Sequence, residues 1–184
     1  MAIIDQHRTW KKVEERLAVE TDPILRRNLE TLLQHMKAEA ALDMDKLMAT
    51  VSENAKYQNF AQGGAGPVGK AAVQKFYEDF ASTGAEKLQH DLDRLVVDKH
   101  CILTEGVMRM AWPGNTLLGM GIDVDDPDAD YVYEARMAIL WPIDENGLFI
   151  GEDSYVGGDG FQGIADRKID PDDIILYRAA EPAA

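Results

Sequence analysis

The sequence holds little of what several large classes of protein require. Its single cysteine, Cys101, excludes an internal disulfide bond and favours a reducing compartment. Only 19 Lys and Arg residues stand against 33 Asp and Glu residues, which gives a formal net charge of −14. The basic residues form no cluster. Because nucleic acids and anionic membrane surfaces bind basic patches, we expect neither as a partner.

Long apolar runs are also missing. No run approaches the roughly 20 apolar residues that span a bilayer. Residues 1–5 lack the basic and apolar regions of a signal peptide, so we expect a cytoplasmic protein. The four histidines and Cys101 do not show the spacing of zinc ligands. The acidic stretch 123–130 lacks the glycine and ligand spacing of a calcium loop. We therefore expect no metal and no cofactor.

The 46% of hydrophobic residues is enough to build a core, and its pattern changes along the chain. Helical periodicity comes first, in residues 3–19, 23–39, 43–51 and 67–82. Strand patterns dominate later, in residues 54–60, 87–97, 101–112, 131–143 and 148–156, whereas residues 113–130 show no clear period. This order predicts an α+β fold with a mostly antiparallel sheet. We divide it into an amphipathic helical extension (1–20), an α+β domain (21–160) and an irregular tail (161–184).

The most informative stretch is Lys56-Tyr57-Gln58-Asn59-Phe60, which precedes a glycine-rich turn. In a strand, Tyr57 and Asn59 lie on the same face, because side chains alternate with period two. A phenol and an amide on a concave face can together hold a water molecule or a substrate oxygen. In the competing interpretation, Tyr57 only covers the core.

Three segments resemble the limonene-epoxide hydrolases of the SnoaL-like, nuclear transport factor 2-like superfamily: residues 57–73, Leu103-Thr104-Glu105-Gly106-Val107, and 146–155. The resemblance extends over residues 23 to about 157. It implies a curved sheet that wraps around helices and leaves a cone-shaped pocket. This fold hosts isomerases, cyclases, hydrolases, dehydratases and binding modules, so the fold does not fix the activity.

The catalytic residues of the hydrolases are not all present. Gly106 and Met108 stand where those enzymes have an Arg and an Asp, and Ser154 stands where they have a second Asp. Only the positions of Tyr57 and Asn59 are retained. The resemblance therefore does not imply epoxide hydrolysis.

Strand alternation indicates which residues replace this machinery. His90 has an ordinary pKa near 6.5 and suits a general base or acid, unless it is a surface histidine. Glu152, if it lies in an apolar cone, has a raised pKa that suits acid–base work, unless it is an exposed edge residue. Arg136 either neutralises an enolate or pairs with Glu134 on a solvated strand. The predicted catalytic residues are Tyr57, Asn59, His90, Glu152 and Arg136, and the predicted pocket residues are Met36, Met108, Glu134 and Ser154.

One further row of residues is unusually apolar. It consists of Tyr131, Tyr133, Ala135, Met137, Ile139 and Trp141 on one face of the strand 131–143. Such a row is either core or a subunit interface. Because a monomer rarely exposes so large an apolar strip, we expect a homodimer or higher even homo-oligomer formed through the outer face of the sheet.

These residues together predict a cofactor-independent acid–base lyase or dehydratase that acts on a hydrophobic aromatic small molecule. Within the superfamily that the sequence resembles, one concrete example is a lyase that takes a lignin-derived aromatic dimer and releases water and formaldehyde. A ketosteroid isomerase-like enzyme, a polyketide cyclase-like enzyme and a non-catalytic small-ligand-binding module remain as alternatives.

Overall fold

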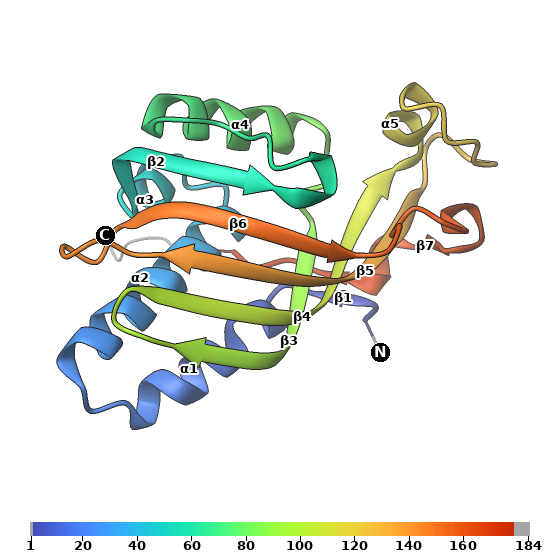
Figure 1. Ribbon diagram of the computed structural model, residues 1–184. Helices are drawn as coiled ribbons and strands as arrows, with labels where there is room; N and C mark the ends of the chain where they lie inside the picture. Colours follow the sequence, from blue (N-terminus) through green and yellow to red (C-terminus); the bar gives the residue numbers. More distant parts are fainter. Residues whose placement is uncertain (1, 179–184) are drawn as a thin grey trace, which may run out of the picture.

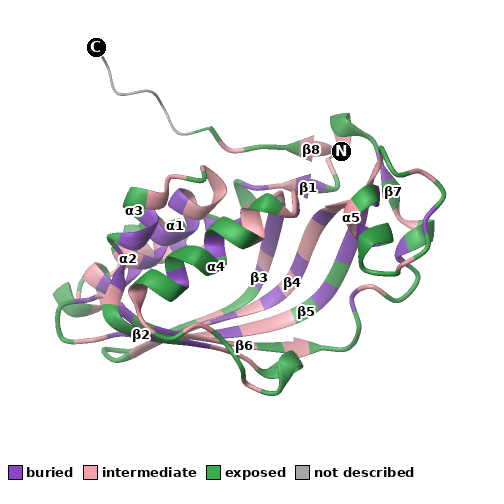
Figure 2. Cartoon of the chain, turned by 90° about the horizontal axis from the view of Figure 1, so that it is seen from above, coloured by how far each residue is buried: buried purple, intermediate pink, exposed green. Residues whose placement is uncertain are grey.

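The computed structural model describes residues 2–178, in which a curved sheet wraps around a layer of helices (Figures 1 and 2). The main strands are β2 (Val51–Asn59), β3 (Leu88–Val97), β4 (Cys101–Pro113), β5 (Asp130–Pro142) and β6 (Phe149–Gly157). They are arranged in the order β2-β6-β5-β4-β3, and only the β2–β6 pair is parallel. The prediction of an α+β cone with a mostly antiparallel sheet is confirmed.

The helices lie together on the concave side of the sheet (Figure 2). They are α1 (Arg8–Val19), α2 (Pro23–Ala40), α3 (Met44–Met48) and α4 (Lys70–Ser82). Helix α2 begins where the sequence predicts, because the Asp22 side chain accepts hydrogen bonds from the Ile24 and Leu25 amides and Pro23 occupies the first position. No helix in the part of the chain that the structure describes is long and apolar enough to cross a membrane.

A bulge bends the sheet into a cone. The register of β3 against β4 shifts between Leu92 and Arg94. Gly106 lies opposite this shift, where a Cβ atom would come within 2.0 Å of the Asp91 carbonyl oxygen. Because a bulge increases the local bend and twist of a strand, this one curves β3 around the helices. Gly106 is needed there for the close approach of the two backbones.

The apolar row of β5 lies on the concave face and belongs to the core. Ile139 and Trp141 pack with Trp10, Leu29 and other side chains from the helices. Tyr131 and Tyr133 pack in a second cluster at the other end of the strand. The structure thus favours the core interpretation of this row, which is not available to form an interface.

The segments before residue 21 and after residue 160 are more ordered than expected. Helix α1 packs into the main core through Trp10 and Val13. β1 (Ile4–Asp5) pairs in parallel with β8 (Ile174–Ile175), and β7 (Lys168–Ile169) pairs with β5. Residues 179–184 of the expected tail lie outside the described residues.

Two predicted boundaries also need correction. The stretch 113–130 contains a short helix, α5 (Gly114–Gly119), which is too short to show a period in the sequence. The first long strand begins at Val51 and not at residue 54, because Val51 already pairs with Phe149 of β6.

Candidate active site

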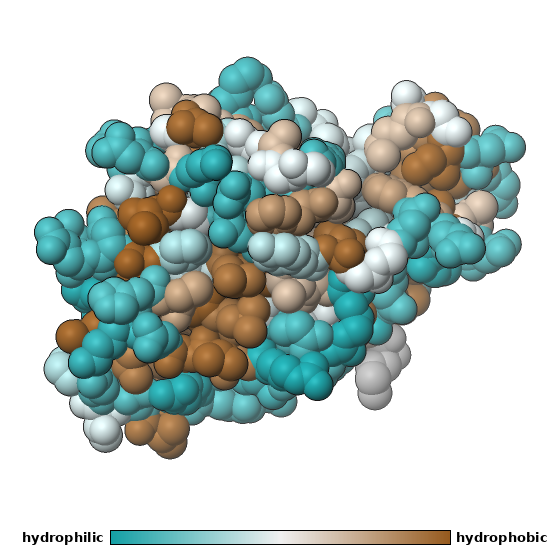
Figure 3. Space-filling view, in the orientation of Figure 1, coloured by the Kyte–Doolittle hydropathy of each residue, from teal (hydrophilic) through white to brown (hydrophobic). Residues whose placement is uncertain are grey.

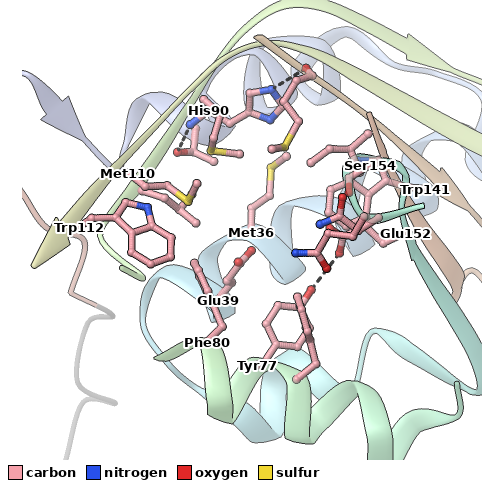
Figure 4. A pocket seen from close by; sticks show the side chains of 18 residues that line it. Met36, Glu39, Tyr77, Phe80, His90, Met110, Trp112, Trp141, Glu152 and Ser154 are labelled. Carbon is pink, nitrogen blue, oxygen red and sulfur yellow. Dashed lines mark hydrogen bonds between the residues drawn. The ribbon is translucent and has the colours of Figure 1, made fainter. Parts of the chain in front are cut away.

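A cavity of about 300 Å³ lies between the helices and the concave face of the sheet (Figure 4). Its wall is mostly apolar and includes the methionines Met36, Met108, Met110 and Met137 and the aromatic residues Phe76, Phe80, Trp112 and Trp141. Its polar residues are few: Thr9, Glu39, Asn59, Gln62, Tyr77, His90, Glu152 and Ser154. A mostly apolar cavity with a few converging polar groups is the usual form of a small-molecule site.

Glu152 extends from β6 into this cavity and meets Tyr77 of helix α4. The Tyr77 hydroxyl oxygen lies 3.1 Å from Oε2 of Glu152. Burial raises the pKa of Glu152 to about 7, a hydrogen bond from Tyr77 opposes this rise, and the nearby charge of Asp153 adds to it. The carboxyl group is therefore able to gain or lose a proton close to neutral pH.

Glu39 brings a second carboxyl group to the same cavity, from the C-terminal end of helix α2 (Figure 4). Burial and, second, the charge of Glu152 raise the pKa of Glu39 to about 8. Two carboxyl groups that oppose each other's ionisation hold different protonation states near pH 7. One can then act as an acid while the other acts as a base.

His90 of β3 forms the opposite wall, and only 2% of its surface is exposed. Burial lowers its pKa to about 4, so the imidazole is neutral at pH 7. Its Nε2 lies 3.3 Å from the Met137 carbonyl oxygen. Since a carbonyl only accepts, Nε2 carries the proton and Nδ1 holds a lone pair on the cavity side (Figure 4). His90 is therefore suited to accept a hydrogen bond from a ligand hydroxyl.

Tyr57 and Asn59 lie beside Glu152 in a second region under the loop 60–69. The Tyr57 hydroxyl is 3.4 Å from the Tyr77 hydroxyl, so Tyr57 reaches Glu152 only through Tyr77. The Asn59 side-chain oxygen accepts a hydrogen bond from the Ala61 amide at 3.0 Å, which leaves its NH₂ group for a ligand. This second cavity, of about 340 Å³, shares Glu152 and Ser154 with the first.

Arg136 and Glu134 are not part of the cavity. Even-numbered residues of β5 point to the convex face, because the odd-numbered ones face the helices. Arg136 lies 2.6 Å from both Asp93 and Glu105, and Glu134 lies 2.6 Å from Arg109. The expectation that these two residues belong to the site is corrected, and we leave both out of it. The other predicted residues that line the main cavity are Met36, Asn59, His90, Met108, Glu152 and Ser154.

Sequence reasoning missed Glu39 and Tyr77 as site residues. Glu39 follows Met36 by three positions on helix α2, and residues three apart share a helix face, so a signal was present. Tyr77 lies on the buried face of α4, where its position in the helix predicts a core residue and gives no sign of a site. Among residues 2–178, no group of three or more His, Cys, Asp or Glu side chains is placed to hold a metal ion.

The fold and the site together define a class of protein, an α+β cone with a mostly apolar cavity that contains a few ionisable groups. Residues 32–148 match the family model described as SnoaL-like domain. The chain therefore belongs to the SnoaL-like family, which confirms the superfamily that the sequence resembles. No curated protein matches the chain.

Solved structures agree on the fold at low sequence identity. A SnoaL-like polyketide cyclase described as putative, from Shewanella putrefaciens CN-32, has a TM-score of 0.63 and 12% identity, with 85% of this chain and 92% of that chain covered. A similarly described protein from Shewanella denitrificans OS-217 has a TM-score of 0.60 and 12% identity, covering 79% and 97%. TerC co-crystallized with polyporic acid has a TM-score of 0.57 and 10% identity, covering 76% and 98%. Such likenesses establish the nuclear transport factor 2-like fold and not the activity.

Proposed function

We propose that this protein is a cofactor-independent acid–base lyase or dehydratase that acts on a hydrophobic aromatic small molecule. The observation that carries the proposal is the pair Glu152 and Glu39, whose pKa values are raised to about 7 and about 8 inside a mostly apolar cavity. Perturbed carboxyl groups that converge on one cavity are typical of acid–base catalysis. A binding module of this fold has no need of them.

The chemistry needs only proton transfers. The protonated carboxyl group gives its proton to a benzylic hydroxyl group, which leaves as water, while the substrate phenol gives its proton to His90 and becomes a quinone methide. The carboxylate then removes the O–H proton of the neighbouring CH₂OH group, and the C–C bond to that carbon breaks to release formaldehyde. The electron pair of this bond forms the alkene and returns the ring to a phenolate, which takes back the proton from His90. His90 Nδ1 is placed to accept the hydrogen bond of such a phenol.

The shape of the site favours a substrate with two rings. The main cavity and the cavity under the loop 60–69 have volumes of about 300 and 340 Å³ and share Asn59, Gln62, Phe76, Glu152 and Ser154. Glu152 thus stands where the two regions meet. A molecule with one aromatic ring in each region places its connecting carbon chain beside this carboxyl group. A lignin-derived aromatic dimer has this form.

The test uses a two-ring phenolic propanediol as substrate, with formaldehyde and the conjugated alkene product measured by absorbance. We expect equal amounts of both, and a loss of about 10² or more in turnover for Glu152→Gln, the size typical of losing a positioned proton donor. Glu53→Gln is the matched control, because the Glu53 side chain is 81% exposed. Proton exchange with solvent without water loss would instead identify an isomerase. Tight binding without any turnover would identify a binding module and overturn the proposal.

We also propose a homodimer or higher even homo-oligomer and a cytoplasmic location. The convex face of the sheet supports the first, because an apolar patch lies on it (Figure 3). Val96, Leu103 and Leu140 lie side by side there, next to the stacked rings of Phe60 and Tyr155. Val96 is 56% exposed. Light scattering at micromolar concentration should give an even multiple of the chain mass, and a monomeric mass would contradict the proposed dimer.

A further inference from the structure

Beneath the cavity, a relay of hydrogen bonds connects Glu152 to the protein interior. It consists of Glu152, Tyr77, His35, Thr50 and the Leu47 carbonyl group. The Tyr77 hydroxyl oxygen is 3.1 Å from Glu152 Oε2 and 3.0 Å from His35 Nε2. His35 Nδ1 is 2.7 Å from Thr50 Oγ1, which is 2.6 Å from the Leu47 carbonyl oxygen. His35 has no exposed surface and Thr50 only 2%, so water does not replace any of these partners.

The inner end of the relay has a fixed direction. The Leu47 carbonyl oxygen can only accept, so Thr50, at 2.6 Å, directs its single hydroxyl proton there. The Thr50 oxygen must then accept the hydrogen bond from His35. The proton of the neutral His35 ring is therefore on Nδ1. Burial keeps the ring neutral, because it lowers the pKa of His35 to about 3.

This direction continues outward to the cavity. With its proton on Nδ1, His35 presents a lone pair at Nε2, and Tyr77 must donate its only proton to it. The Tyr77 oxygen then faces Glu152 and Tyr57 as an acceptor, at 3.1 and 3.4 Å. A carboxylate at Glu152 would meet lone pairs. A protonated carboxyl group at Glu152 would instead donate a hydrogen bond to Tyr77.

We propose that His35 and Thr50 are positioning residues that hold the Tyr77 proton away from Glu152 and so favour the protonated form of Glu152, the form that gives a proton to the leaving group. Neither His35 nor Thr50 lines the cavity, and both act through Tyr77. Their part in turnover rests on the proposed function. The direction of the relay does not, because it follows from the hydrogen bonds alone.

No other group near Glu152 can substitute for this effect. The ionisable groups that face it are Glu39 from α2, Tyr57 from β2, Tyr77 from α4 and its own neighbour Asp153. Burial raises the pKa of Glu152 most, the charge of Asp153 adds to this rise, and a hydrogen bond donated by Tyr77 is the one contribution that would lower it. Because Tyr77 donates to His35, this lowering contribution is absent. The placement of a single proton thus decides how readily Glu152 ionises.

The decisive variant is His35→Phe. Phenylalanine fits the site, since His35 already packs edge-on against Tyr77, Trp141 and Phe149 with ring centroids 5.9, 5.3 and 5.2 Å away. It removes the acceptor for the Tyr77 proton, which then turns to Glu152. We expect the pKa of Glu152 to fall by about 1 to 2 units, the size of one hydrogen bond to a charged group. The readout is carbon-13 NMR of labelled glutamate side chains, with Glu152→Gln to assign the signal.

Two further variants separate the relay from a general structural effect. In the double variant His35→Phe, Tyr77→Phe, Glu152 again has no donor, so its pKa should return to the wild-type value or above. Thr50→Ser keeps the hydroxyl group and should leave the titration unchanged. A pKa of Glu152 that does not fall in His35→Phe, or that stays low in the double variant, would overturn the proposal.

A measurement on the unmodified protein stands beside these variants. Nitrogen-15 NMR distinguishes the two neutral histidine tautomers, and we expect His35 as the Nδ1–H form from pH 5 to pH 8. The Nε2–H form at pH 5 would overturn the proposal even if His35→Phe failed to fold. Neither readout requires a substrate, so failure of the relay and failure of the proposed activity are distinguishable.

Discussion

The variant Glu39→Gln tests whether the cavity raises the pKa of Glu39, and the measurement is the free energy of unfolding, which needs no substrate. The folded protein raises the pKa of Glu39 from 4.5 to about 8. Below pH 4.5 the side chain is neutral in the folded and unfolded states, so it contributes no pH-dependent free energy. Between pH 4.5 and about 8 the unfolded chain releases this proton and the folded one keeps it, so the stability that depends on Glu39 falls as pH rises.

The magnitude follows from the pKa difference, since one pKa unit corresponds to about 1.4 kcal/mol. The native Glu39 should cost about 1 kcal/mol of folding free energy at pH 5 and about 3 to 5 kcal/mol at pH 9. Glutamine has nearly the same shape and never ionises. We therefore expect Glu39→Gln to stabilise the protein more at pH 9 than at pH 5 by several kcal/mol, measured by urea unfolding at both pH values.

A control on the same helix isolates the effect of burial. Glu30 lies on α2 with 53% of its side chain exposed, beside Arg26. Glu30→Gln should change the free energy of unfolding by no more than about 1 kcal/mol at either pH, because exposed ion pairs contribute little. The reasoning is refuted if Glu39→Gln gives the same change at pH 5 and pH 9, or if it destabilises the protein at pH 9.

Three other predictions concern single side chains. Tyr77→Phe should lower turnover by about 10², because the Tyr77 hydroxyl contacts Glu152 directly. Tyr57→Phe should lower turnover less, because Tyr57 contacts only the Tyr77 hydroxyl. A larger loss for Tyr57→Phe than for Tyr77→Phe would count against the site described above. Arg136→Ala should leave turnover unchanged, since its ion pairs lie on the convex face, and a large loss in a kinetic assay would return Arg136 to the site. Gly106→Ala should lower the free energy of unfolding by about 2 kcal/mol or more, because the added Cβ atom would approach the Asp91 carbonyl oxygen. An unchanged free energy of unfolding in urea would contradict the close packing of the bulge.

Much of the fold was predictable because its signals are local. Asp22 and Pro23 mark the start of α2, and glycine and aspartate mark the β5–β6 hairpin at residues 144–147. Period-two alternation puts Glu152 on the same face of its strand as Ser154. The positions of Met108, Ser154 and His90 followed from the resemblance to the hydrolases, and all four residues line the main cavity. The helix start, the hairpin and the alternation need only the residues of a single strand or turn.

The rest depended on how elements face one another, which no single segment encodes. The face of the sheet to which Arg136 points depends on the register of β5 against β4. A shift of one residue in that register reverses the face of every side chain of the strand. Glu39 and Tyr77 reach the cavity because α2 and α4 are rotated in a particular way against the sheet. The packing of α2 against Ile102 and Trp141, and of α4 against Val51 and Ala55, sets these rotations, and all four partners lie on strands away from the helices in the sequence.

The pairing of β1 with β8 has a consequence for how the protein gains and loses structure. Ile4 and Ile174 are neighbours although about 170 residues separate them along the chain. Closing so long a loop is entropically unfavourable before the intervening structure exists, so this pair belongs to the last contacts to form. Two residues on each strand also make it a weak unit. The two strands therefore gain and lose their pairing together, as one unit, and the packing of Ile4 against Ala111 and Val132 ties this unit to the sheet.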